Sequence, residues 1–169
     1  PPVLKPASGT PGTNIAPKAV ASVSHCFGGD TVTALNDNVA PASGQSSDRS
    51  ILRHTFWNRT GGFEWAQYDW DVPQCVSECS VFWWQDGGAI TVPFFWRVLY
   101  RDESGAWVPV RAETPMAQPD QWNTVKFPSV VTRSLRLAVQ CAVGKSAGIL
   151  EGKAIAADPA TGQPGGGGS

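Results

Sequence analysis

Charged residues are scarce in this 169-residue sequence: Asp, Glu, Lys and Arg make up 16% of it, and the formal net charge is −1. Proteins that bind nucleic acids rely on clustered Lys and Arg side chains, so this composition argues against a nucleic-acid partner. No apolar run approaches the roughly 20 residues of a membrane-spanning helix, which predicts no membrane span. The first residues, Pro1, Pro2 and Val3, also lack the basic start and apolar core of a signal peptide.

Catalytic motifs are missing as well. The chain has only two histidines, no G-x-S-x-G, no H-E-x-x-H and no glycine-rich phosphate loop. Cys75 and Cys79 have a tight spacing, but no nearby His or second Cys pair completes a zinc site. Asp69 and Asp71 lie two apart in a strand-like segment and so share one face, which favours a solvated face over a glycosidase pair. We therefore expect a protein without enzyme activity.

The four cysteines are even in number, at positions 26, 75, 79 and 141. In an extracellular domain they could form two disulfides, with three connectivities that the sequence does not distinguish. We prefer the pairs Cys26 with Cys141 and Cys75 with Cys79, because Cys26 follows the first expected strand and Cys141 ends a late one. Free buried thiols are the alternative.

Glycine and proline are abundant, with 18 and 14 copies, and they mark the ends of the chain. Residues 1–18 are rich in Pro, Gly, Ser and Thr and are typical of a linker or N-terminal arm. Residues 157–169 end in a Gly/Ser run and are interpreted as a flexible linker. The fold is therefore expected within residues 19–156.

This central region predicts strands. Segment 64–70 alternates large with small or polar side chains, as a half-buried strand does. Further short runs rich in β-branched and aromatic residues are 80–84, 95–100, 107–110, 124–127, 134–140 and 148–155. Only Thr31 to Asn36 hints at a helix, of one or two turns. The pattern predicts an all-β fold, a β-sandwich or jelly roll.

The eight tryptophans have to be divided between the core and a binding surface. Trp65, Trp70 and Trp96 lie within strand-like segments, which favours the core. Trp83 and Trp84 are adjacent, so on a strand one points inward and the other outward. Both faces of that strand are aromatic, which indicates a strand covered on both sides or one that runs into a binding loop.

A flat indole suits the apolar C–H face of a sugar, and polar neighbours can bind its hydroxyls. Trp84 and Asp86 stand at a strand end beside the pair Gly87-Gly88, where Asp86 could accept hydrogen bonds from two hydroxyls. Trp122 lies in another loop and ranks lower.

A second group precedes the loop 58–62. Arg53, His54 and Trp57 combine hydrogen-bond donors with a stacking platform. The alternative is that Arg53 and His54 pair with carboxylates and that Trp57 caps the core. The candidate ligand-binding residues are thus Arg53, His54, Trp57, Trp84, Asp86 and Trp122.

Several segments carry a resemblance to a known family. Residues 34–37, 64–70 and 148–152 resemble the discoidin-like, coagulation-factor type C module, and four more look like its bacterial variant fused to secreted glycoside hydrolases: 55–57, 80–86, 92–100 and 146–151. The resemblance covers residues 19–156. It implies a galactose-binding-domain-like β-jelly roll that binds carbohydrate and often holds a structural calcium. Asn38 replaces the usual Gly after the Asn-Asp pair, and Asn can still adopt a left-handed turn.

The calcium expectation concerns the turn Asn36-Asp37-Asn38 and the oxygen-rich Ser46, Ser47 and Asp48 after it. In the resembled family this turn closes over the metal together with a residue of the last strand, which corresponds to Glu151. We therefore expect Asp37 and Glu151 to hold a structural Ca²⁺ with backbone oxygens of the turn. The alternative is an Asx turn without a metal.

Together these observations predict a non-catalytic carbohydrate-binding module of a secreted or cell-surface bacterial enzyme. Its partners would be a glycan and a covalently linked catalytic domain in a longer parent chain. By resemblance, the glycan contains arabinose or galactose. The alternatives are a cell-surface adhesion or protein-binding domain of the same fold, and a structural accessory domain of an enzyme.

Overall fold

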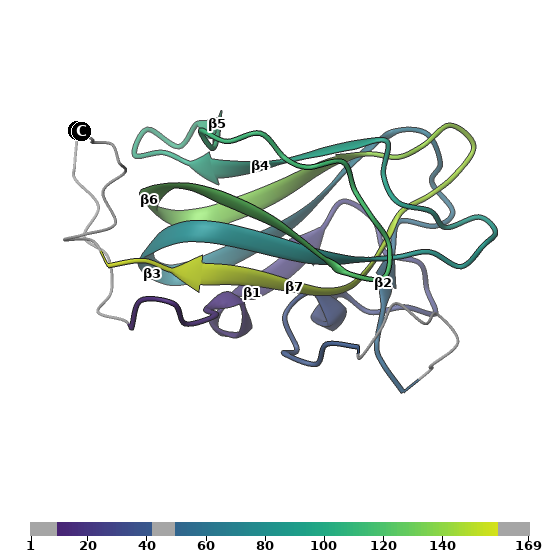
Figure 1. Ribbon diagram of the computed structural model, residues 1–169, viewed down its shortest axis with the longest axis horizontal. Helices are drawn as coiled ribbons and strands as arrows, with labels where there is room; N and C mark the ends of the chain where they lie inside the picture. The colour runs from purple at the N-terminus through teal and green to yellow at the C-terminus, as the bar shows by residue number, and fades with distance from the viewer. Residues whose placement is uncertain (1–9, 42–49, 159–169) are drawn as a thin grey trace.

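A computed structural model describes residues 10–41 and 50–158 (Figure 1). Its elements are η1 (Ala16–Lys18), β1 (Val20–Val23), η2 (Val32–Leu35), β2 (His54–Thr55), β3 (Phe63–Trp84), β4 (Phe95–Arg101), β5 (Trp107–Pro109), β6 (Trp122–Gln140) and β7 (Gly148–Ala156). All pairings between these strands are antiparallel. The all-β prediction is confirmed, and the helical hint is a single turn, η2. No helix of the described residues is long and apolar enough to cross a membrane.

The long strands β3 and β6 each belong to two layers. Residues 63–69 of β3 pair with β1 and with 134–140 of β6, which continues to β4 and β5; we call this the β4 layer. Residues 74–84 of β3 pair with 122–132 of β6 and with β7, which pairs with β2; we call this the β7 layer.

Two prolines account for the register shifts between β3 and β6, the first of which separates the two layers. The register of β3 against β6 shifts between Asp69 and Gln74, where Pro73 lies, and again between Val76 and Glu78, opposite Pro128. Proline has no N–H to donate to a neighbouring strand, so the regular ladder is interrupted at these places.

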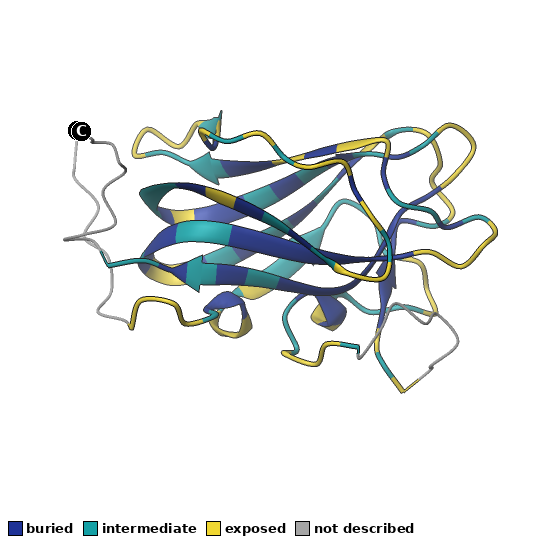
Figure 2. Ribbon diagram, in the orientation of Figure 1, coloured by how far each residue is buried: buried dark blue, intermediate teal, exposed yellow. Residues whose placement is uncertain are grey.

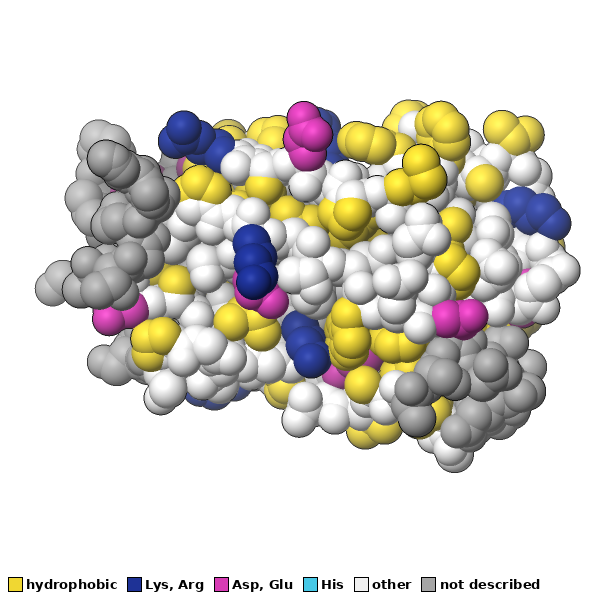
Figure 3. Space-filling view, in the orientation of Figure 1, with side chains coloured by type: hydrophobic (Ala, Val, Ile, Leu, Met, Phe, Trp, Pro, Cys, Tyr) yellow, Lys and Arg dark blue, Asp and Glu magenta, His cyan; other side chains and the backbone are white. Residues whose placement is uncertain are grey.

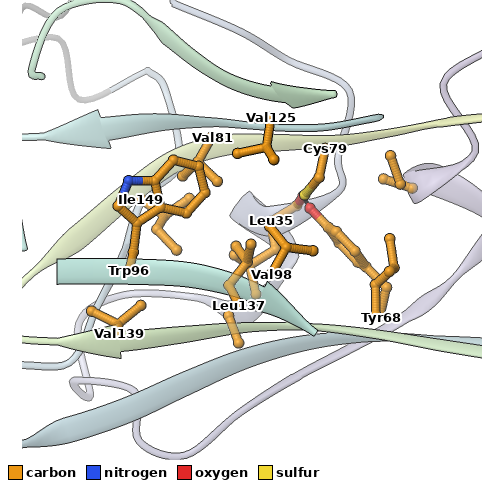
Figure 4. Close-up of a cluster of buried hydrophobic side chains, with 14 of the residues drawn as sticks. Leu35, Tyr68, Cys79, Val81, Trp96, Val98, Val125, Leu137, Val139 and Ile149 are labelled. Carbon is orange, nitrogen blue, oxygen red and sulfur yellow. Dashed lines mark hydrogen bonds between the residues drawn. The ribbon is translucent and has the colours of Figure 1, made fainter. Parts of the chain in front are cut away.

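The core lies between the two layers. Trp83 of the β7 layer and Trp96 of the β4 layer are at most 1% exposed and meet edge to face, with ring centroids 5.6 Å apart. Figure 4 shows Trp96 and Val98 facing Val81 and Val125 across this space. The buried segments follow the strands, whereas exposed residues concentrate in the connecting loops (Figure 2).

The tryptophan predictions are mostly confirmed. Trp70 and Trp96 are buried, whereas Trp83 and Trp84 belong to separate apolar clusters on opposite sides of β3. Trp65 differs from the expectation: it lies on the outer face of the β4 layer, where its ring stacks on the guanidinium of Arg136 at 4.3 Å. In this part of β3 the inward-facing residues are Ala66, which follows Trp65, and the residues at every second position from Ala66.

The packed part of the chain begins before residue 19. Ile15 and Ala16 are buried, and the backbone N–H of Gly12 and of Ile15 donate to carbonyls of β7 at Ala156 and Ala154. The N-terminal segment therefore extends the edge of the β7 layer, and its described part is not a free linker.

All four cysteines are free, so the preferred disulfide pairs are not formed. Cys75 and Cys79 lie four residues apart on the same strand, β3, which separates them by about 13 Å at the usual rise per residue. A disulfide joins Cα atoms only about 4.4 to 6.8 Å apart. Burial raises the pKa of Cys79 to about 12, which keeps its sulfur in the thiol form.

Candidate functional site

A hollow of about 240 Å³ opens at the end of the sandwich where β2 and the end of β3 meet. Three segments far apart in the sequence form it: the loop after β1, the region of β2, and the end of β3 with the loop that follows it. Its lining residues are Phe27, Asp30, Thr55, Trp57, Trp84, Asp86, Ala89 and Ile90. The structure thus brings together three of the six predicted ligand-binding residues.

The two tryptophans of the hollow differ in exposure. Trp57 is half-buried, whereas Trp84 is only 6% exposed and shows the hollow a small part of its ring. Trp84 packs with Phe82, Ile90 and Leu150 in a second apolar cluster, against which Trp57 also lies. This outer cluster holds both indoles in place beside the hollow.

Arg53 supports Trp84 from behind. Its side chain is buried, and its guanidinium carbon lies 4.5 Å from the centroid of the Trp84 ring. Its Nη2 also donates to the carbonyl of Ile51. Arg53 does not line the hollow. In the structure it positions Trp84 and does not reach a ligand in the hollow.

Asp86 shapes the loop that borders the hollow. Its Oδ1 accepts hydrogen bonds from the backbone N–H of Gly88 at 2.7 Å and of Ile90 at 3.0 Å. Gly87, between Asp86 and Gly88, has a φ of 78°, a conformation that glycine adopts without strain. The glycine pair singled out in the sequence therefore lets this turn fold back on the Asp86 carboxylate.

His54 lies inside the molecule and does not line the hollow. It is fully buried, and its ring meets that of Phe56 edge to face at 4.6 Å. Burial lowers the pKa of His54 to about 4, with a smaller contribution from His25. The expectation that His54 donates to a bound ligand is therefore corrected: its neighbour Thr55 faces the hollow instead.

Trp122 is also outside the hollow. It starts β6 and packs edge to face on Phe82, with ring centroids 5.5 Å apart, while the Lys153 ammonium lies 4.3 Å from its ring. On the face seen in Figure 3, charged side chains are few and lie among hydrophobic and uncharged polar groups.

Five lining residues were missed by sequence reasoning: Phe27, Asp30, Thr55, Ala89 and Ile90. Phe27 and Asp30 come from the loop after β1, and the hydroxyl of Thr55 donates to Asp30 Oδ2 at 2.5 Å. Asp30 follows the pair Gly28-Gly29, the same kind of signal that drew attention to Asp86. Only the fold brings this segment to the others.

The predicted calcium ligands lie beside each other. Glu151 is 1% exposed, and neither of its carboxylate oxygens has a hydrogen-bond partner of normal geometry among the described residues. Burial raises the pKa of Glu151 to about 9, and the neighbouring Asp37 carboxylate adds to the rise, partly offset by the N–H groups of Asn38 and Gly152. A buried carboxylate that faces a second carboxylate fits a cation-binding position.

The turn that carries Asp37 has the expected form. Asn38 has a φ of 61°, as predicted for the residue that replaces glycine, and Asp37 Oδ1 accepts from the N–H of Val39 at 2.9 Å. Within residues 10–41 and 50–158, no group of three or more His, Cys, Asp or Glu side chains could hold a metal. Ser46, Ser47 and Asp48 lie outside the described residues.

No protein-family model matches the sequence, but solved structures do. A structure from the β-galactosidase BgaA of Streptococcus pneumoniae is 20% identical with a TM-score of 0.74, over 86% of this chain and 99% of that one. The family 32 carbohydrate-binding module of Clostridium perfringens NanJ, solved with galactose, is 16% identical with a TM-score of 0.67, over 84% and 97%.

A chitosan-binding module of a chitosanase/glucanase from Paenibacillus sp. IK-5 is 15% identical with a TM-score of 0.64, over 84% of this chain and 98% of that one. At these identities the likeness concerns the fold. The fold is the discoidin-like jelly roll of carbohydrate-binding modules from glycoside hydrolases, which confirms the fold that the sequence resemblance implied.

Proposed function

Starting from this fold, we propose that the chain is a non-catalytic carbohydrate-binding module that tethers a covalently linked glycoside hydrolase domain to a glycan. The observation that carries the proposal is the hollow, where two indoles stand beside the side chains of Asp30, Thr55 and Asp86. A few polar groups around an apolar platform are typical of small-ligand sites. In keeping with the resemblance, the ligand is an arabinose- or galactose-containing glycan, and the protein is secreted or on the cell surface.

The half-buried indole of Trp57 supplies the stacking surface, and the buried Trp84 forms the wall behind it. The carboxylates of Asp30 and Asp86 accept hydrogen bonds from sugar hydroxyls. A shallow site of this kind binds one sugar weakly, and linkage to a catalytic domain converts that weak binding into a high local substrate concentration.

The test is the substitution Trp57→Ala, read on arabinan, galactan and a mammalian glycan array. Because Trp57 is half-buried, we expect the protein to stay folded and its affinity to fall by about tenfold, equivalent to about 1.4 kcal/mol. Trp122→Ala is the matched control, since it removes another half-buried indole outside the hollow. Unchanged affinity of Trp57→Ala, or a chain that binds a surface protein and no glycan, contradicts the proposal.

We also propose that Asp37 and Glu151 hold a structural Ca²⁺ with backbone oxygens of the turn. The support is the buried Glu151 carboxylate, which lies beside Asp37 and has no hydrogen-bond partner of normal geometry among the described residues. A bound cation would compensate these charges and tie the turn after η2 to β7.

Removal of calcium with EDTA tests this second proposal. At an ion concentration of about 100 times its Kd, binding adds about 3 kcal/mol to the free energy of unfolding, so the melting temperature falls when the ion is removed. Glu151→Gln abolishes the calcium response, whereas Asp71→Asn, at an exposed position of β3, retains it. An unchanged melting temperature in excess EDTA contradicts the calcium site.

A further inference from the structure

A second aromatic surface lies on the outer face of the β4 layer, away from the hollow. Two cross-strand rows form it, each running over β3, β6 and β4 in register. The first row is Phe63, Gln140 and Phe95, and the second is Trp65, Ala138 and Arg97. Residues in such rows point to the same face of a sheet, so these side chains are neighbours.

The rows enclose a slot of about 230 Å³, lined by Phe63, Glu64, Phe95, Arg97, Ala138, Val139 and Gln140. Its two phenylalanines are unusually open for apolar residues: Phe63 is 80% exposed and Phe95 is 49% exposed. Gln140 lies between the two phenylalanines in the first row, and Ala138 of the second row adds a small side chain to the floor beside it. A flat ring can therefore enter the slot and contact aromatic surface.

Phe95 and Arg97 also border a second hollow of about 320 Å³, on the side of β5. The two residues thus form a ridge with open space on both sides. Along the same face, Arg136 lies between the rings of Trp65 and Trp107, at 4.3 and 4.4 Å, which fixes the neighbouring surface.

The charge of the slot favours an anion. Arg97 is exposed, and in the described parts of the chain its guanidinium forms no hydrogen bond or ion pair. Glu64 borders the slot, but its carboxylate is buried, accepts from the Ser24 hydroxyl at 2.6 Å and pairs with Arg59 at 3.3 Å. The exposed Glu113 borders the second hollow, so we expect an anion on the Phe63 side of the ridge.

We propose that this slot is a second sugar site, which binds a carboxylate-bearing sugar of an acidic glycan. The sugar ring packs on Phe95 and Phe63, and its carboxylate pairs with Arg97. The side-chain amide of Gln140 hydrogen-bonds to hydroxyls. The proposal rests on the proposed carbohydrate-binding function, but it uses residues of a different face.

The experiment measures binding of polygalacturonate and of 3′-sialyllactose to the whole chain, with methyl-esterified polygalacturonate and lactose as uncharged counterparts. We expect at least one acidic probe to bind more tightly than its counterpart, and that probe identifies the source of the carboxylate. Arg97→Gln and Phe95→Ala are each expected to weaken its binding by about tenfold, because a charge-assisted hydrogen bond or a stacking surface is lost. Lys126→Gln, which removes a charge from the β7 layer, leaves the affinity unchanged.

Both tested side chains are exposed, so the melting temperature should not change and a loss of binding can be assigned to the slot. Three results overturn the proposal: neither acidic probe binds, both slot variants bind as well as the unmodified chain, or Trp57→Ala abolishes binding of the acidic probe. Failure of the proposed function gives a different result. In that case neutral glycans do not bind at the Trp57 hollow, whereas the measurements with the acidic probes still test the slot.

Discussion

In two pairs of adjacent residues, one residue lies in the interior of the protein and the other lies at the candidate binding hollow. On β3, Trp83 is fully buried against Trp96, whereas Trp84 faces the other way and backs the hollow. On β2, His54 is buried against Phe56, whereas Thr55 lines the hollow. In each pair one step along a strand separates a residue that stabilises the fold from one that shapes a surface.

The comparison shows that burial alone does not identify the function of a side chain. Trp84 is 6% exposed, close to the value for the core residues, yet it belongs to a small cluster beside the loops. Trp83 belongs to the large cluster that joins both layers. Substitutions within each pair should therefore separate stability from binding.

The largest expected effect is that of Trp83→Ala. The substitution leaves a cavity in the centre of the core, where Trp83 packs on Trp96, so we expect a loss of about 3–5 kcal/mol in the free energy of unfolding. Trp84→Ala should cost about 2 kcal/mol, because the small outer cluster can relax toward the hollow. Denaturant unfolding of the two variants measures the difference.

Glycan binding gives the opposite order. Trp84→Ala should lose binding under conditions where it is still folded, whereas a folded fraction of Trp83→Ala should bind normally. Equal losses of stability in the two variants would show that both indoles belong to one core.

His54 provides the second test, through pH. In the unfolded chain His54 has its ordinary pKa of 6.5, whereas in the folded chain burial lowers the pKa of His54 to about 4. Between these two pH values the unfolded state binds more protons than the folded state. The free energy of unfolding is therefore highest above pH 6.5 and falls by about 3 kcal/mol in total as the pH falls toward 4. Urea unfolding at pH 7, 5.5 and 4 measures this change.

His54→Gln removes the titrating group and should flatten this part of the pH profile. A variant that keeps the full slope would assign the acid sensitivity to other groups and would leave His54 without a measurable role.

Much of the fold follows from patterns within single segments of the sequence. The alternation in segment 64–70 and the aromatic runs predicted strands that the structure contains, and the adjacency of Trp83 and Trp84 predicted their opposite faces. These predictions succeed because strand periodicity is a local property of the chain.

The candidate site was less predictable, because it depends on which segments meet. The sequence around Asp30 does not predict its contact with Thr55, 25 residues away. The direction in which Trp65 and His54 point depends on where β6, β7 and the loops pack against their strands. The layer change of β3 likewise depends on Pro73 and on its partner strand.

The smallest expected effect is that of Thr55→Val, at the hollow side of the second pair. Valine keeps the shape of threonine but removes the hydroxyl that donates to Asp30 Oδ2, so the free energy of unfolding should fall by about 1 kcal/mol. The Asp30 carboxylate is then no longer held toward the hollow, and glycan affinity should fall by a few-fold while the acid sensitivity of His54 is retained. Calorimetric titration with the best glycan, together with the pH series, measures both effects in one variant. If Thr55→Val instead loses the acid sensitivity and keeps its glycan affinity, Thr55 belongs to the interior, and His54 and Thr55 do not differ in role.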